Sequence, residues 1–384
     1  MSFAVLALVM ALGLFGPLLA TPRRWQIPVV IGELLAGLLI GRTGFNVVDS
    51  ADPTFSLLGN IGFALIMFVA GTHVPLRNTQ LRSALAKGAG RAVAVAALSV
   101  AFAVVIALSF SILHAPLYAV LIASSSAALV LPIIESSHLD GPEVLALTAQ
   151  VAIADAAAII ALPLAIDPPR AGIAALGVLV IAGCAALLFV LMRSTERSGL
   201  RSRVRAFSEQ RKFALELRLQ LIVLFALAAL AMFSQVSIML AGFSFGLAVS
   251  AVGQPRRLAR QLFAITEGFF GPVFFLWIGA SLNLRELLDH PPMILLGLAL
   301  GVAAILSHLA IRALGLPWPL GILSAAQLGV PVAAVAISTQ SGLLLPGEAS
   351  ALILGSLLTI AASSLLAHFP SSVHGKPRAR SEDK

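Results

Sequence analysis

Long apolar runs separated by short polar stretches follow one another along almost the whole chain. About thirteen of them have a length near 20 residues, enough for a helix to cross a hydrocarbon layer of about 30 Å. Backbone groups in lipid must bond within their own segment, so each run is expected to be helical. The sequence therefore predicts an all-α polytopic membrane protein. The expected spans are Phe3–Ala20, Ile27–Ile40, Phe55–Ala70, Lys87–Phe110, Pro116–Ile134, Val144–Ile166, Ala171–Leu191, Leu217–Phe233, Val236–Val252, Phe263–Ala280, Met293–Leu314, Pro317–Thr339 and Ala349–Ala367.

Basic residues between the runs predict the orientation, because Lys and Arg collect on the cytoplasmic side. With the N-terminus outside, only Arg42, Arg170 and Arg285 fall on the external side. We therefore expect an inner (plasma) membrane protein with an external N-terminus and a cytoplasmic C-terminus. The first run has no basic region before it, which predicts a retained helix and not a cleaved signal peptide. The cytoplasmic side then holds Arg23, Arg24, Arg77, Arg82, Lys87, Arg91, the stretch Arg193–Arg218, Arg256, Arg257, Arg260, Arg312 and the tail Lys376–Lys384.

Composition agrees with lipid as the surrounding medium and excludes other classes. Hydrophobic residues make up 59% of the 384 positions and charged residues 11%, and the mean hydropathy is +1.01. The net charge of +8 does not indicate a nucleic-acid partner, because the basic residues sit in loops between apolar runs. Those loops are expected to contact anionic lipid headgroups. The single cysteine, Cys184, rules out a disulfide within the chain.

Two runs carry small polar residues and prolines at matching places, which predicts broken helices. Taken singly, such a run is as often a kinked helix whose hydroxyls bond back to their own backbone. The basic stretch Arg193–Arg218 divides the chain into two six-span halves with the seventh span as connector, and each interrupted run is second from the end of its half. This match favours two inverted repeats with broken crossing helices. The interrupting residues are Ser124, Ser125, Ser126 and Pro132 in the fifth span and Ser324, Gln327, Gly329 and Pro331 in the twelfth.

Asp155 is the one acidic residue of seventeen that lies in the middle of an apolar run. A charged side chain at that depth costs at least about 2.5 kcal/mol, so it marks an ion pathway by default. The alternative is a structural carboxylate bonded to a hydroxyl of the next helix.

Burial disfavours the ionised form of Asp155 and lets protons compete for it, whereas a small cation stabilises that form. Proton and cation then exclude one another, and the result is coupled exchange. Oxygen atoms of Ser124, Ser125 and Ser126 are expected to complete the shell that a hard alkali cation requires.

Other ionisable residues are candidates for supporting roles. His308 lies in or near the eleventh span and is a candidate second proton carrier, with a structural histidine near the cytoplasmic face as the alternative. Gln327 and Ala154 are expected beside the ion site. Glu33 and Glu267 lie near span starts, where a gate or a helix N-terminus is the expected role.

Several motifs together resemble the monovalent cation:proton antiporter-2 family, which includes sodium/hydrogen-exchanger-like and Kef-type transporters. The likeness covers most of the chain. Asp155 falls on the second residue of the family's Asp-Asp or Asn-Asp pair, Ala154 replaces the first, and His308 stands where electrogenic members carry a lysine. The motifs are Pro28–Gly41 (PVVIGELLAGLLIG), Ala241–Ala248 (AGFSFGLA), Pro272–Gly279 (PVFFLWIG) with Glu267 ahead of it, and the pair Ser125 and Ser126.

The resemblance implies a homodimer, no cofactor, and a core domain that moves against a dimerisation domain. Its implied divisions are dimerisation helices in 1–85 and 217–285, core helices in 86–167 and 286–369, a linker helix and basic loop in 168–216, and a basic tail in 370–384. Since one titrating carboxylate exchanges one proton for one cation, Ala154 leads us to expect electroneutral exchange of Na⁺ or K⁺ for H⁺.

Three alternatives remain at this point. A Kef-like potassium channel would use the same broken helices without coupling. An organic-anion symporter would share the inverted-repeat scaffold. A transporter-like sensor would need a signalling partner. No nucleophile and base pair, metal cluster or phosphate-binding loop indicates an enzyme.

Overall fold

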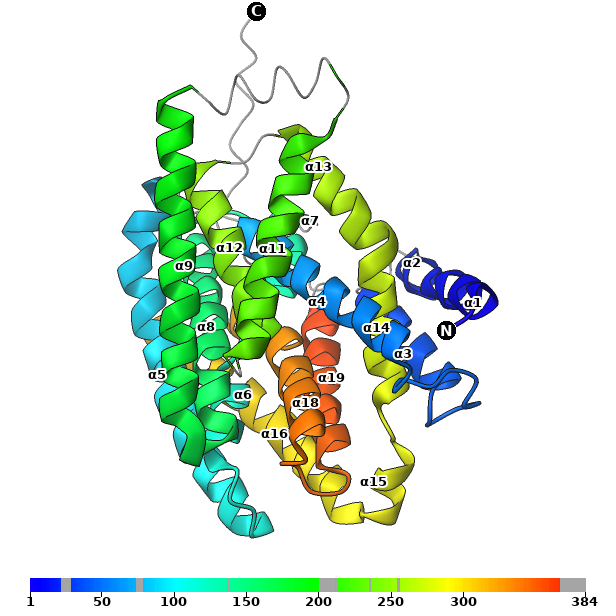
Figure 1. The fold of residues 1–384 in the computed structure, drawn as a ribbon. Coiled ribbons are helices and arrows are strands. Elements are labelled where there is room, and N and C mark those ends of the chain that lie inside the picture. Colours follow the sequence, from blue (N-terminus) through cyan, green and yellow to red (C-terminus); the bar gives the residue numbers. More distant parts are fainter. Residues whose placement is uncertain are drawn as a thin grey trace, which may run out of the picture.

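In a computed structural model of the chain, the described residues are 1–21, 29–73, 79–136, 139–199, 211, 213–234, 236–253 and 256–366. They form helices and no strand (Figure 1). The helices are α1 Phe3–Gly13, α2 Phe15–Ala20, α3 Val29–Ile40, α4 Pro53–His73, α5 Thr79–Phe110, α6 Ala115–Ala123, α7 Ala127–Ser136, α8 Pro142–Ile166, η1 Pro168–Arg170, α9 Ala171–Arg197, α11 Leu215–Phe233, α12 Ile238–Val252, α13 Arg256–Ile265, η2 Thr266–Phe270, α14 Gly271–Ser281, α15 Arg285–Asp289, α16 Pro291–Leu309, η3 Ala310–Leu314, α17 Trp318–Ser324, α18 Gly329–Ser341 and α19 Glu348–Leu366.

The all-helical polytopic prediction is confirmed. Each of the thirteen expected spans corresponds to one helix or to consecutive helices of the described chain. Nine helical segments among the described residues have the length and apolar composition needed to cross a membrane, and Val29–Ile40, Ile238–Val252 and Glu348–Ser364 are shorter apolar helices. Most of the basic loops used to predict orientation, and the tail 370–384, lie outside the described residues.

Two of the expected spans differ in detail from the helices that form them. The first span is present with the predicted bounds, Phe3–Ala20, but it is divided at Leu14, because α1 ends at Gly13 and α2 begins at Phe15. Pro17 explains the break, since its ring clashes with the carbonyl four residues earlier, that of Gly13. The fourth span was predicted to start at Lys87, whereas α5 starts at Thr79. Hydropathy marks the part of a helix that lies in lipid, and the helix continues beyond it into the polar region.

One set of helices, α3, α4, α12 and α14, packs closely through glycines, and we call it the first helix group. A Cβ added at Gly37 on α3 would lie 2.4 Å from the Leu276 carbonyl oxygen, and one added at Gly279 on α14 would lie 2.3 Å from that of Leu34. Gly71 and Gly246 make the same kind of contact between α4 and α12. Small residues let membrane helices approach to backbone contact, so these crossings rigidify the first helix group.

A second set of helices, α5, α6, α8, α16 and α19, also packs together, and we call it the second helix group. The half-helices α7, α17 and α18 pack on it through α8 and α19. Between the two groups, α9 contacts both α8 and α12. The expected ion site lies within the second helix group.

Candidate functional site

Both predicted helix breaks are present, and they lie against each other. The first separates α6 from α7 at Ser124–Ser126, and the second separates α17 from α18 at residues 325–328. The Ser126 backbone N–H donates to the Ala326 carbonyl at 2.8 Å. The Ser125 hydroxyl donates to the Ser324 carbonyl at 2.6 Å. The two unwound segments therefore supply hydrogen-bond partners to each other's backbone groups. Non-helical backbone within a membrane needs such partners, because lipid offers none.

The prolines do not cause these breaks, contrary to the expectation. Pro132 lies inside α7, six positions after Ser126, and its side chain is outside the described part. Pro331 is the third residue of α18. In the first turn of a helix the missing N–H of proline would have no intrahelical acceptor anyway, so Pro331 is well placed to begin the half-helix.

Asp155 on α8 reaches the start of the half-helix α7. Its side chain is buried, and the residue is 7% exposed. Its Oδ2 atom accepts a hydrogen bond from the backbone N–H of Ala127 at 2.9 Å. Ala127 is the first residue of α7, so the carboxylate faces the positive end of a helix dipole and one of its free N–H groups. This partner could not be predicted from the sequence, because a backbone N–H carries no side-chain signal.

The three serines of the first break are buried, each no more than 4% exposed. The Ser124 hydroxyl donates to the Leu121 carbonyl at 2.8 Å, while that of Ser125 bonds across to α17. The hydroxyl protons of Ser124 and Ser125 are thus used on backbone carbonyls, and the lone pairs of these two oxygens remain available to a cation. The serines fix the shape of the break beside Asp155.

His308 and Gln327 lie close to the place where the two helix breaks meet. His308 is fully buried, and its Nδ1 atom is 3.0 Å from the Ser324 hydroxyl oxygen. That hydroxyl already donates to the Gly321 carbonyl at 2.7 Å, so Nδ1 is the atom that carries hydrogen. The Nε2 atom has no hydrogen-bond partner among the described residues. Nε2 is therefore the nitrogen without hydrogen in the neutral imidazole. The Gln327 side chain donates from Nε2 to the Ile122 carbonyl at 3.3 Å, linking α6 to the second break.

A polar stripe on α19, which was not predicted, supports the second break. The Ser356 hydroxyl donates to the Gln327 carbonyl at 2.6 Å. The Gln327 N–H donates to the Thr359 hydroxyl at 3.3 Å, and the Ser363 hydroxyl donates to the Ile322 carbonyl at 3.0 Å. Spacings of three and four residues put these hydroxyls on one helix face, a signal that was present in the sequence.

Three candidates remain. Ala154 carries no polar group, and Glu33 and Glu267 lie away from the two helix breaks. Ala154 is buried beside Asp155, which leaves one carboxylate at this point of α8. Glu33 is 4% exposed on α3, and Glu267 lies on the π-helical turn η2 near enough to interact with it electrostatically. Both belong to the α3 and α14 side of the molecule. They form an acidic pair away from Asp155.

The chemistry of the site suits a small monovalent cation as cargo. No cluster of three or more His, Cys, Asp or Glu occurs within the described ranges, so a multidentate transition-metal site is not indicated there. One carboxylate with backbone and hydroxyl oxygens supplies the hard oxygen ligands that group 1 and group 2 cations prefer. A single negative charge balances a single positive one.

Comparison with known proteins agrees with this geometry. The chain is similar to the putative Na⁺/H⁺ antiporter YjbQ of Bacillus subtilis, with 25% identity over 92% of this chain and 60% of that protein. It is also similar to the probable Na⁺/H⁺ antiporter 3 of Methanocaldococcus jannaschii, with 25% identity over 84% of this chain and 85% of that protein. The chain therefore spans less than two thirds of the length of the Bacillus relative.

A solved structure shares the fold. The sodium proton antiporter MjNhaP1 from Methanocaldococcus jannaschii, determined at pH 8, matches with a TM-score of 0.64 and 16% identity over 94% of this chain and 95% of that one. The sequence model described as "Sodium/hydrogen exchanger, transmembrane" matches residues 6–369, nearly the whole chain. The chain, which has a membrane-type helical fold, two broken helices and a buried aspartate, belongs to the transmembrane sodium/hydrogen exchanger family.

Proposed function

We propose that this protein is a secondary antiporter that exchanges a monovalent cation for protons at Asp155. The observation that carries the proposal is the position of this buried carboxylate at the N-terminus of the half-helix α7, beside the crossing of two broken helices. Relatives named as Na⁺/H⁺ antiporters favour Na⁺ over K⁺ as the cation.

Competition at one carboxylate explains the coupling. Removal from water disfavours the empty, charged form of Asp155, whereas a proton or a cation neutralises it. The loaded forms then cross between the two access states much more readily than the empty form. Each cation moved in one direction is matched by protons moved in the other.

The two helix groups supply the moving parts of this proposal. The second helix group acts as the core domain that carries Asp155, and the glycine-packed first helix group acts as the dimerisation domain of a homodimer. Alternating access then amounts to movement of one group against the other. In the plasma membrane, Arg197 at the last turn of α9 lies on the cytoplasmic side with anionic lipids, and Arg170 before its first turn lies outside.

The relatives also favour one branch of the family. The motifs led us to expect the antiporter-2, Kef-type branch, but the matching fold is that of an NhaP antiporter. We therefore assign the chain to the NhaP kind of exchanger and not to Kef-type potassium efflux.

A pH-jump assay in proteoliposomes tests the proposal. Addition of Na⁺, K⁺ or Li⁺ to vesicles with an internal pH-sensitive dye should produce a cation-dependent pH change with the wild-type protein and none with Asp155→Asn. The substitution keeps the side-chain volume and removes the titrating charge. Continued coupling in Asp155→Asn would remove Asp155 from the mechanism, and cation flux without any pH change in the wild type would indicate a channel.

The stoichiometry is a separate part of the proposal. Because Ala154 leaves one carboxylate, one proton should exchange for one cation and no net charge should move. Vesicles on a solid-supported membrane should show no steady current under a Na⁺ gradient. A current that disappears in His308→Gln would instead identify Nε2 of His308 as a second proton carrier.

A further inference from the structure

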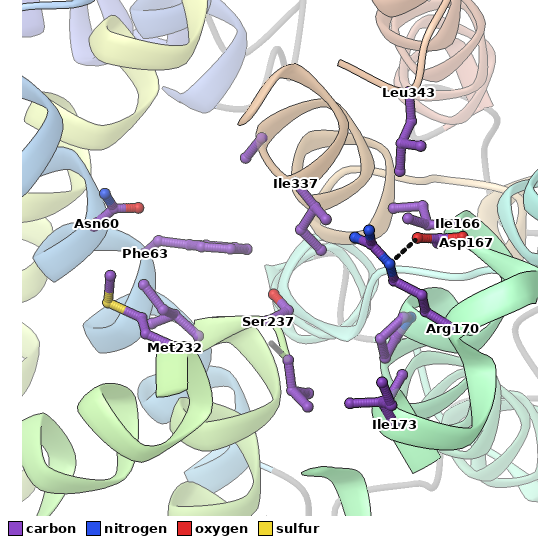
Figure 2. A pocket seen from close by; sticks show the side chains of 15 residues that line it. Asn60, Phe63, Ile166, Asp167, Arg170, Ile173, Met232, Ser237, Ile337 and Leu343 are labelled. Atoms are coloured by element: carbon purple, nitrogen blue, oxygen red, sulfur yellow. Dashed lines mark ion pairs between the residues drawn. The ribbon is translucent and has the colours of Figure 1, made fainter. Parts of the chain in front are cut away.

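A cavity of about 510 Å³ opens between the two helix groups at the end of α8 that carries Asp167. Its wall combines α4, α8, α9, α11, α12 and α18, and its polar side chains include Asn60, Asp167, Arg170 and Ser237 (Figure 2). In the orientation proposed above, this end of α8 faces the outside. The cavity therefore occupies the place of an external vestibule.

Asp167 is an unusual residue to find directly after a helix. It is the C-cap of α8, where the helix dipole and the last carbonyls are negative and favour a cation. Arg170 supplies one, since its Nε atom lies 3.6 Å from Asp167 Oδ2. The Asp167 side chain is 22% exposed and that of Arg170 is 76% exposed, so water and ions reach the pair. A solvated guanidinium held this loosely is readily replaced by another cation.

Pro163 provides a second polar group deeper along the same helix. It lies inside α8 and lines the cavity. Proline has no N–H, so the carbonyl of Ile159, four residues earlier, loses its normal hydrogen-bond donor. Helix carbonyls point toward the C-terminus, which here is the direction of Asp167. The Ile159 oxygen therefore lacks the donor that residue 163 would normally supply, and it points along α8 toward the cavity.

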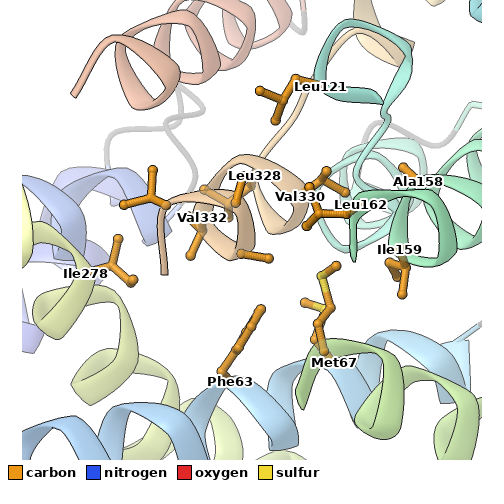
Figure 3. Packing of buried hydrophobic residues seen from close by; sticks show 14 of the residues in the cluster. Phe63, Met67, Leu121, Ala158, Ile159, Leu162, Ile278, Leu328, Val330 and Val332 are labelled. Atoms are coloured by element: carbon orange, nitrogen blue, oxygen red, sulfur yellow. The ribbon is translucent and has the colours of Figure 1, made fainter. Parts of the chain in front are cut away.

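A layer of apolar side chains lies between the cavity and Asp155. Figure 3 shows Phe63 and Met67 of α4 extending toward Leu162 of α8 and Val330 of α18. These four side chains are buried, each at most 6% exposed. Desolvated ions do not cross such a layer without polar stepping points, and Ile159 lies on α8 one turn before Leu162.

We propose that Asp167 is the external capture site for the transported cation, with Arg170 as its exchangeable counter-ion and the Ile159 carbonyl as the next ligand on the way to Asp155. This inference rests on the proposed exchange function. Asp155, Ile159, Pro163 and Asp167 follow one another at four-residue intervals, about 6 Å each along the helix axis. A cation that displaces Arg170 leaves the charge at Asp167 balanced throughout.

Kinetics from the two sides of the membrane test the role of Asp167. In right-side-out vesicles, Asp167→Asn should raise the KM for external Na⁺ about threefold, the size of an exposed ion-pair contribution, while Vmax stays the same. In inside-out vesicles, the KM for Na⁺ at the cytoplasmic face should not change. Asp167→Glu should restore the wild-type external KM, and Arg170→Gln should lower it because a competing cation is removed.

Asp49 provides a matched control on the same side of the protein. It forms a solvent-exposed pair with Arg42 at 3.9 Å and does not line the cavity. Asp49→Asn should leave the external KM at the wild-type value. An unchanged KM in Asp167→Asn, or an equal change in Asp49→Asn, would overturn the capture site and leave exchange at Asp155 intact. Absence of exchange in the wild type would overturn the proposed function itself.

The substitution Pro163→Ala tests the carbonyl ligand. It restores an N–H to pair with the Ile159 oxygen, so turnover should fall severalfold, while the melting temperature should rise because a helix-interior proline is removed. A structural role alone for Pro163 would not combine lower turnover with higher stability. Unchanged turnover in a more stable variant would remove the Ile159 carbonyl from the path.

Discussion

The glycine contact between α3 and α14 gives the sharpest test of the packing. A Cβ placed on Gly37 would lie 2.4 Å from the Leu276 carbonyl oxygen and 2.9 Å from the Cα of Gly279. Ordinary van der Waals contact begins at 3.4 Å, so Gly37→Ala requires the two helices to separate by about 1 Å. Both nearest groups are backbone, which cannot move aside by a change of rotamer.

The expected cost follows from two opposing terms. Overpacking of this kind costs about 1–3 kcal/mol, at the upper end where backbone must shift. Alanine offsets up to about 1 kcal/mol of that through its higher helix propensity. The net destabilisation of Gly37→Ala is therefore about 1–2 kcal/mol. One kcal/mol lowers the melting temperature of a globular domain of 150–250 residues by about 2–4 °C, and the shift should be smaller in this longer chain.

Exposed helical glycines supply the matched control. A Cβ on Gly90 of α5 or Gly183 of α9 would meet nothing within 4 Å, so alanine there should be neutral or stabilising. Melting curves of purified protein in one detergent, read by fluorescence or by aggregation, compare the three variants directly. Equal melting temperatures for Gly37→Ala and Gly183→Ala would refute the close approach of α3 and α14.

Two further predictions concern charged groups at the ends of the helices. A hydrogen bond to Glu348 at 2.7 Å raises the pKa of His114 above its usual 6.5. The charged imidazole therefore contributes its full stabilisation below about pH 6.5. This contribution is lost as the pH rises through the raised pKa. Melting temperatures measured from pH 5 to 9 should lose that pH-dependent step in His114→Gln. Glu143→Gln should lower the melting temperature more than Arg91→Met does, because it leaves the buried Arg91 guanidinium without the carboxylate that it contacts at 2.7 Å.

The sequence was sufficient to predict the spans and both helix breaks, because hydropathy and small polar residues act through each segment alone. It could not identify which backbone groups meet. Ala127 has a methyl side chain and no chemical signal, yet its N–H is the hydrogen-bond donor to Asp155. Gly37 and Gly279 were visible as residues, but their contact depends on a crossing between helices more than 200 positions apart in the chain. The roles assigned to Asp155 and His308 stay predictions.

The hydrogen bond from Ala127 indicates how the protein sets the competition at Asp155. Burial favours the protonated carboxyl, whereas this N–H and the dipole of α7 favour the ionised form that binds a cation. Ala127→Pro removes the donor at the first helical position, where proline is well tolerated. A hydrogen bond to a charged group contributes about 1.5–3 kcal/mol, so the pH profile of exchange should move upward by about one to two units.

Ala127→Gly separates this effect from a change in helix shape, because it retains the N–H and should leave the pH profile in place. Exchange rates from pH 5.5 to 9.5 in proteoliposomes give both profiles. A profile of Ala127→Pro that coincides with that of Ala127→Gly would mean that the half-helix N-terminus does not set the balance between proton and cation. If only the proline variant shifts, the backbone of the break, and not a second acidic side chain, tunes the exchanger to its working pH.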